Sequence, residues 1–168
     1  TDGTTPTPET GIKYTEPVDL NAGGSITVWE KAAPDLKATY SYEKITSVPV
    51  LVKASSSSEP GNGPDRMLDG DPSTIWHSMY SVTVANYPHW IELDANDEVS
   101  IKGFKYMPRQ SGNNGNVKGY KLEVSVDGEN WSQVAEGVFP YNAEKQTVLF
   151  EKAVKARYVR FTATSSQN

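Results

Sequence analysis

The sequence predicts an all-β fold, and two observations support that prediction. From residue 45 onward, short runs rich in Val, Ile, Tyr and Phe are separated by clusters of Gly, Pro, Asn and Asp, the pattern of strands joined by turns. No long helical stripe of apolar residues lies between these runs, so a fold of alternating strands and helices is disfavoured. The expected architecture is an antiparallel β-sandwich.

Alternation with a period of two identifies individual strands within this region. Leu122, Val124 and Val126 fall on one face of such a strand. The Asp127-Gly128 pair that follows accepts the positive φ of a tight hairpin turn, and the polar run 94–98 is expected to be a turn between two strands. The expected strands are Pro49–Ala54, Trp90–Asp94, Ile101–Met107, Tyr120–Val126, Trp131–Ala135, Gln146–Phe150 and Tyr158–Thr164.

The chain of 168 residues is long enough for one well-buried core. Residues 1–12 are rich in Thr and Pro, and we expect a disordered linker there. Residues 13–44 give mixed signals and form an N-terminal extension whose role the residues do not define, although Ser25–Trp29 alternates like a strand. Residues 45–168 are expected to form the folded module. Because the chain opens with Thr1 and carries no signal segment, we expect a mature or excised fragment.

Composition disfavours several classes of function. The net charge is -5 and no Lys/Arg run occurs, so neither nucleic acid nor an anionic membrane is an expected partner. The absence of cysteine excludes disulfides and Cys-ligated zinc and leaves the compartment open. No nucleophile elbow, metalloprotease motif or phosphate-binding loop occurs, and only two histidines are present. We therefore expect no enzymatic activity.

The segment Asp69-Gly70-Asp71-Pro72-Ser73-Thr74 has the composition of a loop that binds a hard cation. Calcium takes six to eight oxygens from carboxylates, hydroxyls and carbonyls, and Gly and Pro allow a tight loop to turn such groups inward. The EF-hand spacing is missing. An ordinary turn capped by its own side chains is the alternative, and on spacing alone that alternative is favoured.

Three polar residues in two separate segments of the chain suit the recognition of sugar hydroxyls. The imidazole of His77, the guanidinium of Arg109 and the carboxamide of Asn114 can each bridge neighbouring hydroxyls. Tyr80 is the nearest aromatic platform for the apolar face of a pyranose. Taken singly, each residue has a plainer explanation that is favoured, His77 as a structural histidine beside Trp76 and Arg109 as a solvated loop residue.

The remaining aromatic and histidine residues have plainer interpretations. We expect Trp76, Trp90 and Trp131 to be buried in the sandwich, because they lie in or beside apolar, strand-like segments. His89 is expected to be an exposed strand residue.

Taken in order, the motifs of this chain resemble the discoidin, or coagulation-factor type C, superfamily. Within it they are most similar to family 32 carbohydrate-binding modules, and the resemblance covers about Ile45 to Thr164. The segments that carry it are Ala54–Ser56, Met67–Ser78, Tyr87–Asp94, Ile101–Phe104, Tyr106–Gln110, Val124–Trp131 and Ala156–Phe161.

This resemblance implies a galactose-binding-domain-like β-sandwich, or jelly roll, with a structural calcium ion. It implies ligands from the Arg66 carbonyl, the Asp69 carboxylate, Asp71 and Thr74, with an acidic residue after the last strand. That last position falls near Ser166, which departs from the family pattern and would weaken the site without abolishing it.

The resemblance also assigns the sugar site. His77, Arg109 and Asn114 match the positions that galactose-type members use, and Tyr80 falls where the family often has an aromatic platform. A second platform and a closing strand usually follow the last conserved strand. Either the fragment is truncated before them, or an N-terminal strand such as Ser25–Trp29 takes the place of the closing strand.

The function so implied is that of a non-catalytic module that binds terminal galactose-type or N-acetylhexosamine sugars. It would be a monomer tethered to other domains, targeting a glycoside hydrolase or a surface protein to glycans. The expected location is secreted, periplasmic or cell-surface, in a bacterium. The alternative is a protein-interaction or structural module without sugar binding, in which residues 79–82 form an apolar spike.

Overall fold

The structure is a computed structural model that describes residues 7, 9–16, 18, 24–30, 32–42 and 47–168. It divides into two compact units, Thr1–Ser47 and Val48–Asn168. Most of the predicted linker, residues 1–6 and 8, lies outside the described residues. Within the described part of the chain, no helix is long and apolar enough to cross a membrane.

The first unit contains a two-stranded antiparallel sheet of β1 (Gly24–Glu30) and β2 (Ala33–Tyr42). Its register runs from Gly24 opposite Tyr42 to Trp29 opposite Lys37, and the hydroxyls of Thr27 and Thr39 lie 2.8 Å apart across the pair. The alternating segment Ser25–Trp29 is therefore a strand, as predicted. Its pairing partner within the first unit is β2.

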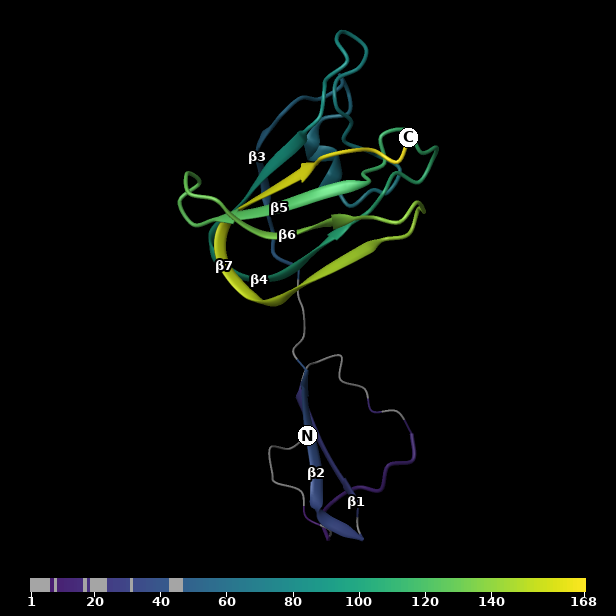
Figure 1. Cartoon of the computed structure of the whole chain (residues 1–168), viewed down its shortest axis with the longest axis vertical. Helices are drawn as coiled ribbons and strands as arrows, with labels where there is room; N and C mark the ends of the chain where they lie inside the picture. The colour runs from purple at the N-terminus through teal and green to yellow at the C-terminus, as the bar shows by residue number, and fades with distance from the viewer. Residues whose placement is uncertain (1–6, 8, 17, 19–23, 31, 43–46) are drawn as a thin grey trace. The chain divides into compact units, whose positions relative to one another are not determined.

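The second unit is built on a five-stranded antiparallel sheet with the order β3-β4-β7-β5-β6 (Figure 1). A short 3-10 helix, η1 (Pro64–Met67), lies in the connection between β3 and β4. The strands are β3 (Leu51–Ser55), β4 (His89–Tyr106), β5 (Gly119–Ser125), β6 (Ser132–Val138) and β7 (Gln146–Ala163). The all-β prediction is confirmed.

Two pairs of expected strands are each one long strand. Residues 90–94 and 101–107 were expected to be separated by a turn, but β4 runs through the polar segment, with a register shift between Asp94 and Val99. Asn96 adopts a φ of 66° there, which an Asn tolerates and which bends the strand without ending it. β7 likewise joins the two segments expected at 146–150 and 158–164. Figure 1 shows β4 and β7 curving together.

The curvature of β4 and β7 brings aromatic side chains from distant parts of the sheet into one core. Phe104, in the C-terminal half of β4, lies with its ring centroid 5.7 Å from that of Phe161, in the C-terminal half of β7. Tyr120 stacks on Phe139 at 4.2 Å, and Phe104 lies 5.5 Å from Tyr120. Aromatic pairs at these separations stabilise the core beyond the area that they bury.

The alternation along the strands separates an inner face from an outer face. Ile91 of β4 and Leu122 of β5 are fully buried, and both register with Phe161 of β7. Their sequence neighbours on these strands point to the opposite, outer face of the sheet. The core therefore lies on one side of the sheet only.

Candidate functional site at the loop end

The strand register gathers three separate segments at one end of the sheet. Ser55, at the end of β3, pairs with Ile91 near the start of β4. Ala163, at the end of β7, pairs with both His89 and Tyr120, near the starts of β4 and β5. The loops 56–88 and 107–118 and the C-terminal residues 164–168 consequently meet there. All the predicted site residues lie in these three segments.

The loop expected to bind calcium brings four oxygen-bearing groups together. The hydroxyl oxygen of Thr74 lies 2.7 Å from Asp69 Oδ2 and 3.0 Å from the carbonyl oxygens of both Arg66 and Asp71. A hydroxyl has one proton and can donate to only one of these three acceptors at a time. A cluster of oxygens with more lone pairs than protons suits a hard cation, so the residues present fit calcium.

The loop is further shaped by its own side chains. Asp69 Oδ1 accepts a hydrogen bond from the Asp71 amide at 2.8 Å, and Asp71 Oδ1 accepts from both the amide and the hydroxyl of Ser73. The bonds from Ser73 lower the pKa of Asp71 below its ordinary value. The same hydrogen bonds are found in an ordinary turn capped by its own side chains, which is the alternative to a cation-binding loop. Among the described residues, no three His, Cys, Asp or Glu side chains gather into a metal-binding group.

Ser166, the fifth expected metal ligand, has other hydrogen-bond partners. It forms an isolated bridge with Val117, and its hydroxyl donates to the carbonyl of Asn168. The structure thus brings Arg66, Asp69, Asp71 and Thr74 together, whereas these contacts of Ser166 are with the 107–118 loop and the C-terminal residues.

His77 and Tyr80 form one wall of the predicted sugar site. Their rings meet edge to face with centroids 4.8 Å apart, and Tyr80 is 53% exposed. His77 Nδ1 lies 2.7 Å from the Ser78 carbonyl oxygen. Because a carbonyl only accepts, Nδ1 carries a proton, and in the tautomer protonated only there Nε2 is an acceptor. Nε2 faces Gly115, where an added Cβ would lie 3.4 Å from it.

Arg109 and Asn114 form the facing wall. The guanidinium of Arg109 donates from Nε to the Ser111 carbonyl at 2.7 Å and from Nη1 to the Asn114 carbonyl at 3.3 Å. These bonds hold the guanidinium in place and do not use Nη2. The Asn114 side-chain oxygen accepts from Asn168 Nδ2 at 3.0 Å. The contact between His77 and Gly115 brings this loop against the first wall.

Glu59 is a part of this end that sequence reasoning missed. Its side chain is 6% exposed, and Oε2 accepts hydrogen bonds from the amides of Tyr80 at 2.8 Å and Ser81 at 3.0 Å. Desolvation raises its pKa, but hydrogen bonds from Ser81 and Tyr80 and the charge of His77 outweigh that effect and lower it. The Glu59 amide donates to the His77 carbonyl at 2.8 Å. Glu59 therefore holds the backbone of the His77–Tyr80 wall. The sequence around Glu59 contains no motif that predicts this role.

Two expectations about strand residues near this end are wrong. His89, expected to be exposed, is only 8% exposed because it shares the inner face with Ile91. Trp90, expected to be buried, is only partly buried and points to the outer face. Alternation puts His89 on the face of Ile91 and Leu93 and Trp90 on the face of Glu92 and Asp94, and the packing of the sheet buries the first of these faces.

Comparisons with known proteins agree with this geometry. The family model for the F5/8 type C domain matches residues 52–168. A sialidase from Micromonospora viridifaciens is 39% identical over 103 residues, which is 60% of this chain and 16% of the sialidase. The chain therefore spans about a sixth of the length of that relative.

Solved structures show the same fold. The module CpGH89CBM32-5 from Clostridium perfringens, in complex with GalNAc-β-1,3-galactose, aligns with a TM-score of 0.66 and 31% identity over 71% of this chain and 86% of that one. The module CBM32-3 from a family 31 glycoside hydrolase of the same organism aligns with a TM-score of 0.65 and 29% identity, over 71% of this chain and 81% of that one.

The chain belongs to the F5/8 type C, or discoidin, domain family. Its fold is the β-sandwich of the family 32 carbohydrate-binding modules, so the predicted galactose-binding-domain-like jelly roll is confirmed. Like those neighbours, it is a non-catalytic binding module.

Proposed function

We propose that this module binds glycans at its loop end and recognises a terminal galactose-type or N-acetylhexosamine sugar. The observation that carries the proposal is the contact of His77 with Gly115, which unites two loops 38 residues apart in sequence. That contact brings the loop that carries Arg109 and Asn114 against His77 and the exposed ring of Tyr80. The solved relative in complex with GalNAc-β-1,3-galactose supports the same class of ligand.

The proposed contacts follow from the chemistry of a pyranose. Nε2 of His77 accepts a hydrogen bond from one hydroxyl, while Arg109 Nη2 and the Asn114 amide donate to others. The ring of Tyr80 packs on the apolar C–H face of the sugar. A shallow site of this kind binds one sugar at roughly millimolar to high-micromolar Kd, about -4 to -6 kcal/mol. Useful retention on a glycan then requires neighbouring modules or sites.

Calcium is proposed to occupy the 66–74 loop. The ligands would be the carbonyl of Arg66, the carboxylate of Asp69, the carbonyl of Asp71 and the hydroxyl of Thr74. The positive ion would attract these oxygens together and so stiffen the segment that leads to His77. Ser166, or water, would complete the shell in place of an acidic residue.

The larger protein is proposed to be a glycoside hydrolase or a surface protein that this module targets to glycans. The relative modules come from glycoside hydrolases, and the chain spans only a small part of the curated relative. We place the protein outside the cytoplasm of a bacterium, as a secreted, periplasmic or cell-surface protein. The module itself would be a monomer tethered to other domains.

The proposal is tested by titrating isotope-labelled protein with galactose and with N-acetylgalactosamine. We expect both His77→Ala and Arg109→Ala to abolish the sugar-induced chemical-shift changes while the amide spectrum stays folded. Lys145→Ala, an exposed change in another loop, is the control and should titrate like the wild type. Unchanged titrations in both site variants would reject the loop end as the sugar site.

A second candidate function is protein binding through an apolar loop. Val82 and Val84, which follow Tyr80, are 79% and 72% exposed. Exposed apolar side chains that lie close together are typical of a protein-binding surface. A glycan array probed with calcium present separates the two candidates. Binding to galactose-terminated glycans favours the first, whereas an array without signal favours the second.

A further inference from the structure

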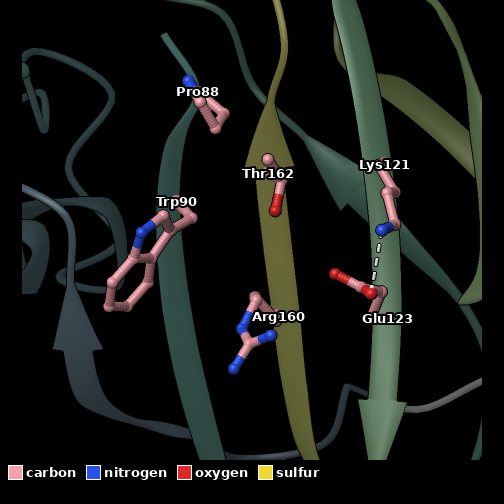
Figure 2. A pocket seen from close by; sticks show the side chains of 6 residues that line it. All are labelled: Pro88, Trp90, Lys121, Glu123, Arg160 and Thr162. Carbon is pink, nitrogen blue, oxygen red and sulfur yellow. Dashed lines mark ion pairs between the residues drawn. The ribbon is translucent and has the colours of Figure 1, made fainter. Parts of the chain in front are cut away.

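The outer face of the five-stranded sheet carries a pocket that adjoins the loop end at Pro88 and extends along the strands (Figure 2). Strands β4, β7 and β5 place side chains there in register, in two adjacent rows across the sheet. The first row is Trp90, Thr162 and Lys121, and the second is Glu92, Arg160 and Glu123.

The pocket has a volume of about 420 Å³, within the range of about 300–1,000 Å³ typical of small-molecule sites. Its lining combines one aromatic residue with charged and hydroxyl side chains, as Figure 2 shows. The lining residues are Pro88, Trp90, Lys121, Glu123, Arg160 and Thr162.

Arg160 stands at the centre of this surface and is held from two directions. Glu92 Oε1 accepts hydrogen bonds from its Nη2 at 2.6 Å and its Nε at 3.0 Å. The guanidinium also lies 3.9 Å from the ring centroid of Trp131 and 6.0 Å from that of Trp90. The Glu92 bonds leave Nη1 unused. A guanidinium fixed in this way presents donors in a defined direction, at little further cost in side-chain entropy.

The charges of the two rows cancel in pairs. Arg160 is neutralised by Glu92, and Lys121 Nζ lies 2.9 Å from Glu123 Oε1. The carboxylates are the more buried partners, with side chains 11% and 16% exposed. Lys53, 3.8 Å from Glu92, does not line the pocket. The pocket therefore offers closely spaced donors and acceptors without a strong net charge, which favours a neutral, hydroxyl-rich ligand over an anion.

The backbone of this face cannot take up an added peptide strand. β4 is paired with β3 and β7, β7 with β4 and β5, and β5 with β7 and β6. No strand edge is open within the pocket, so strand addition is excluded there. Recognition must use the side chains, and an aromatic ring beside paired donors and acceptors suits a sugar.

We propose that this sheet-face pocket is a second carbohydrate site, which binds a neutral linear oligosaccharide laid across β4, β7 and β5. A pyranose packs on the ring of Trp90. Its hydroxyls meet Arg160, Thr162 and the Lys121–Glu123 pair. The pocket is open, so it contacts the interior of a chain, whereas the loop end contacts a terminal sugar. The two sites on one module then add avidity.

The first test uses Arg109→Ala protein, in which the proposed loop site is removed. It is titrated with lacto-N-tetraose, chitotriose and cellotriose while the tryptophan indole and backbone amide signals are recorded. We expect the Trp90 indole and the Thr162 amide to shift. The Trp76 indole is an internal control, because it donates to the Ser57 carbonyl at 3.2 Å and the Ser58 hydroxyl at 3.1 Å. Absence of shifts on this face with all three sugars overturns the proposal.

The second test uses variants in the Arg109→Ala background, against whichever sugar shifts the signals most. Trp90→Ala should raise Kd roughly tenfold, because the apolar face of the sugar loses the ring on which it packs. Thr162→Val removes one hydroxyl with little change of shape and should raise Kd severalfold. This variant keeps the test valid if Trp90→Ala does not fold. Thr147→Val, the same change on β7 outside the pocket, is the control. Wild-type affinity in folded Trp90→Ala and in Thr162→Val overturns the proposal.

Discussion

The hydroxyl of Thr74 lies 2.7 Å from a carboxylate oxygen of Asp69, inside a loop where two carbonyl oxygens crowd the same hydroxyl. The oxygens of this loop thus converge on one point. One proton can satisfy only one of the three acceptors at a time, and a cation bound by the same oxygens would satisfy the others. The relationship is the physical basis for the proposed calcium site, and it yields a direct test.

Thr74→Val should abolish stabilisation by calcium. The change keeps the shape of the side chain but removes the oxygen at the centre of the cluster. In the wild type, calcium at 100 times Kd should add about 2.7 kcal/mol to the free energy of unfolding. Differential scanning calorimetry with calcium and then with EDTA measures this, with Thr147→Val as the matched control. If the melting temperature of the wild type is the same with calcium and with EDTA, the site is not occupied by calcium.

Gly115→Ala should weaken sugar binding at the loop end. Gly115 has a φ of 76°, which L side chains rarely adopt, and the new Cβ would lie 3.4 Å from His77 Nε2. The methyl group would therefore strain the loop and crowd the acceptor that the proposed sugar needs. Titration with galactose should give a severalfold higher Kd. Gly61→Ala, where φ is 81° and nothing lies within 4 Å of the added Cβ, separates backbone strain from crowding.

His89 should make the fold less stable in mild acid. Desolvation, helped by the charge of His77, lowers the pKa of His89 below the ordinary 6.5, and its buried Nδ1 has no hydrogen-bond partner among the residues that the structure describes. The unfolded chain takes up a proton near 6.5, while the folded protein does so only at lower pH. The free energy of unfolding should therefore fall as the pH drops from 6.5 toward the folded pKa.

Urea unfolding at pH 7.5, 6.5 and 5.5 measures this dependence. In His89→Phe, which cannot be protonated, the decline over that range should be smaller than in the wild type. Equal slopes in the two proteins would assign the acid sensitivity to other groups.

Leu122→Ala should destabilise the module strongly. Leu122 is 2% exposed and registers with Phe161, so truncation leaves a cavity in the core, at a cost of about 2–5 kcal/mol. Gln133→Ala, on the exposed part of β6, should stay within about 0.5 kcal/mol of the wild type. Urea denaturation compares the two, and similar free energies of unfolding would contradict the inner face assigned to β5.

Properties that depend on neighbouring residues were accessible from the sequence. Alternation predicted the all-β class and the face of Leu122, because strand geometry sends successive side chains to opposite sides. The loop from Asp69 to Thr74 was equally readable, since its oxygens lie within six residues and a tight turn brings them together. The family followed from motifs that occur in order along the chain.

The bending of β4 and the assembly of both sites depended on tertiary structure. The polar run at 94–98 has the composition of a turn, yet pairing with β7 on either side keeps it within one strand. The contact of His77 with Gly115 and the support of Tyr80 by Glu59 join residues far apart in sequence. Local propensity carries no information about such pairs.

The sequence by itself therefore determined the fold class, the family and the residue types available at the loop end. Only the tertiary structure decided that Trp90 faces outward while His89 is buried, and that Arg160 of β7 meets Trp131 beside β6. The physical reason is that alternation defines two faces of a strand but not which one is covered. Burial is set by the packing of the whole sheet, where the aromatic core covers one face and leaves the other open.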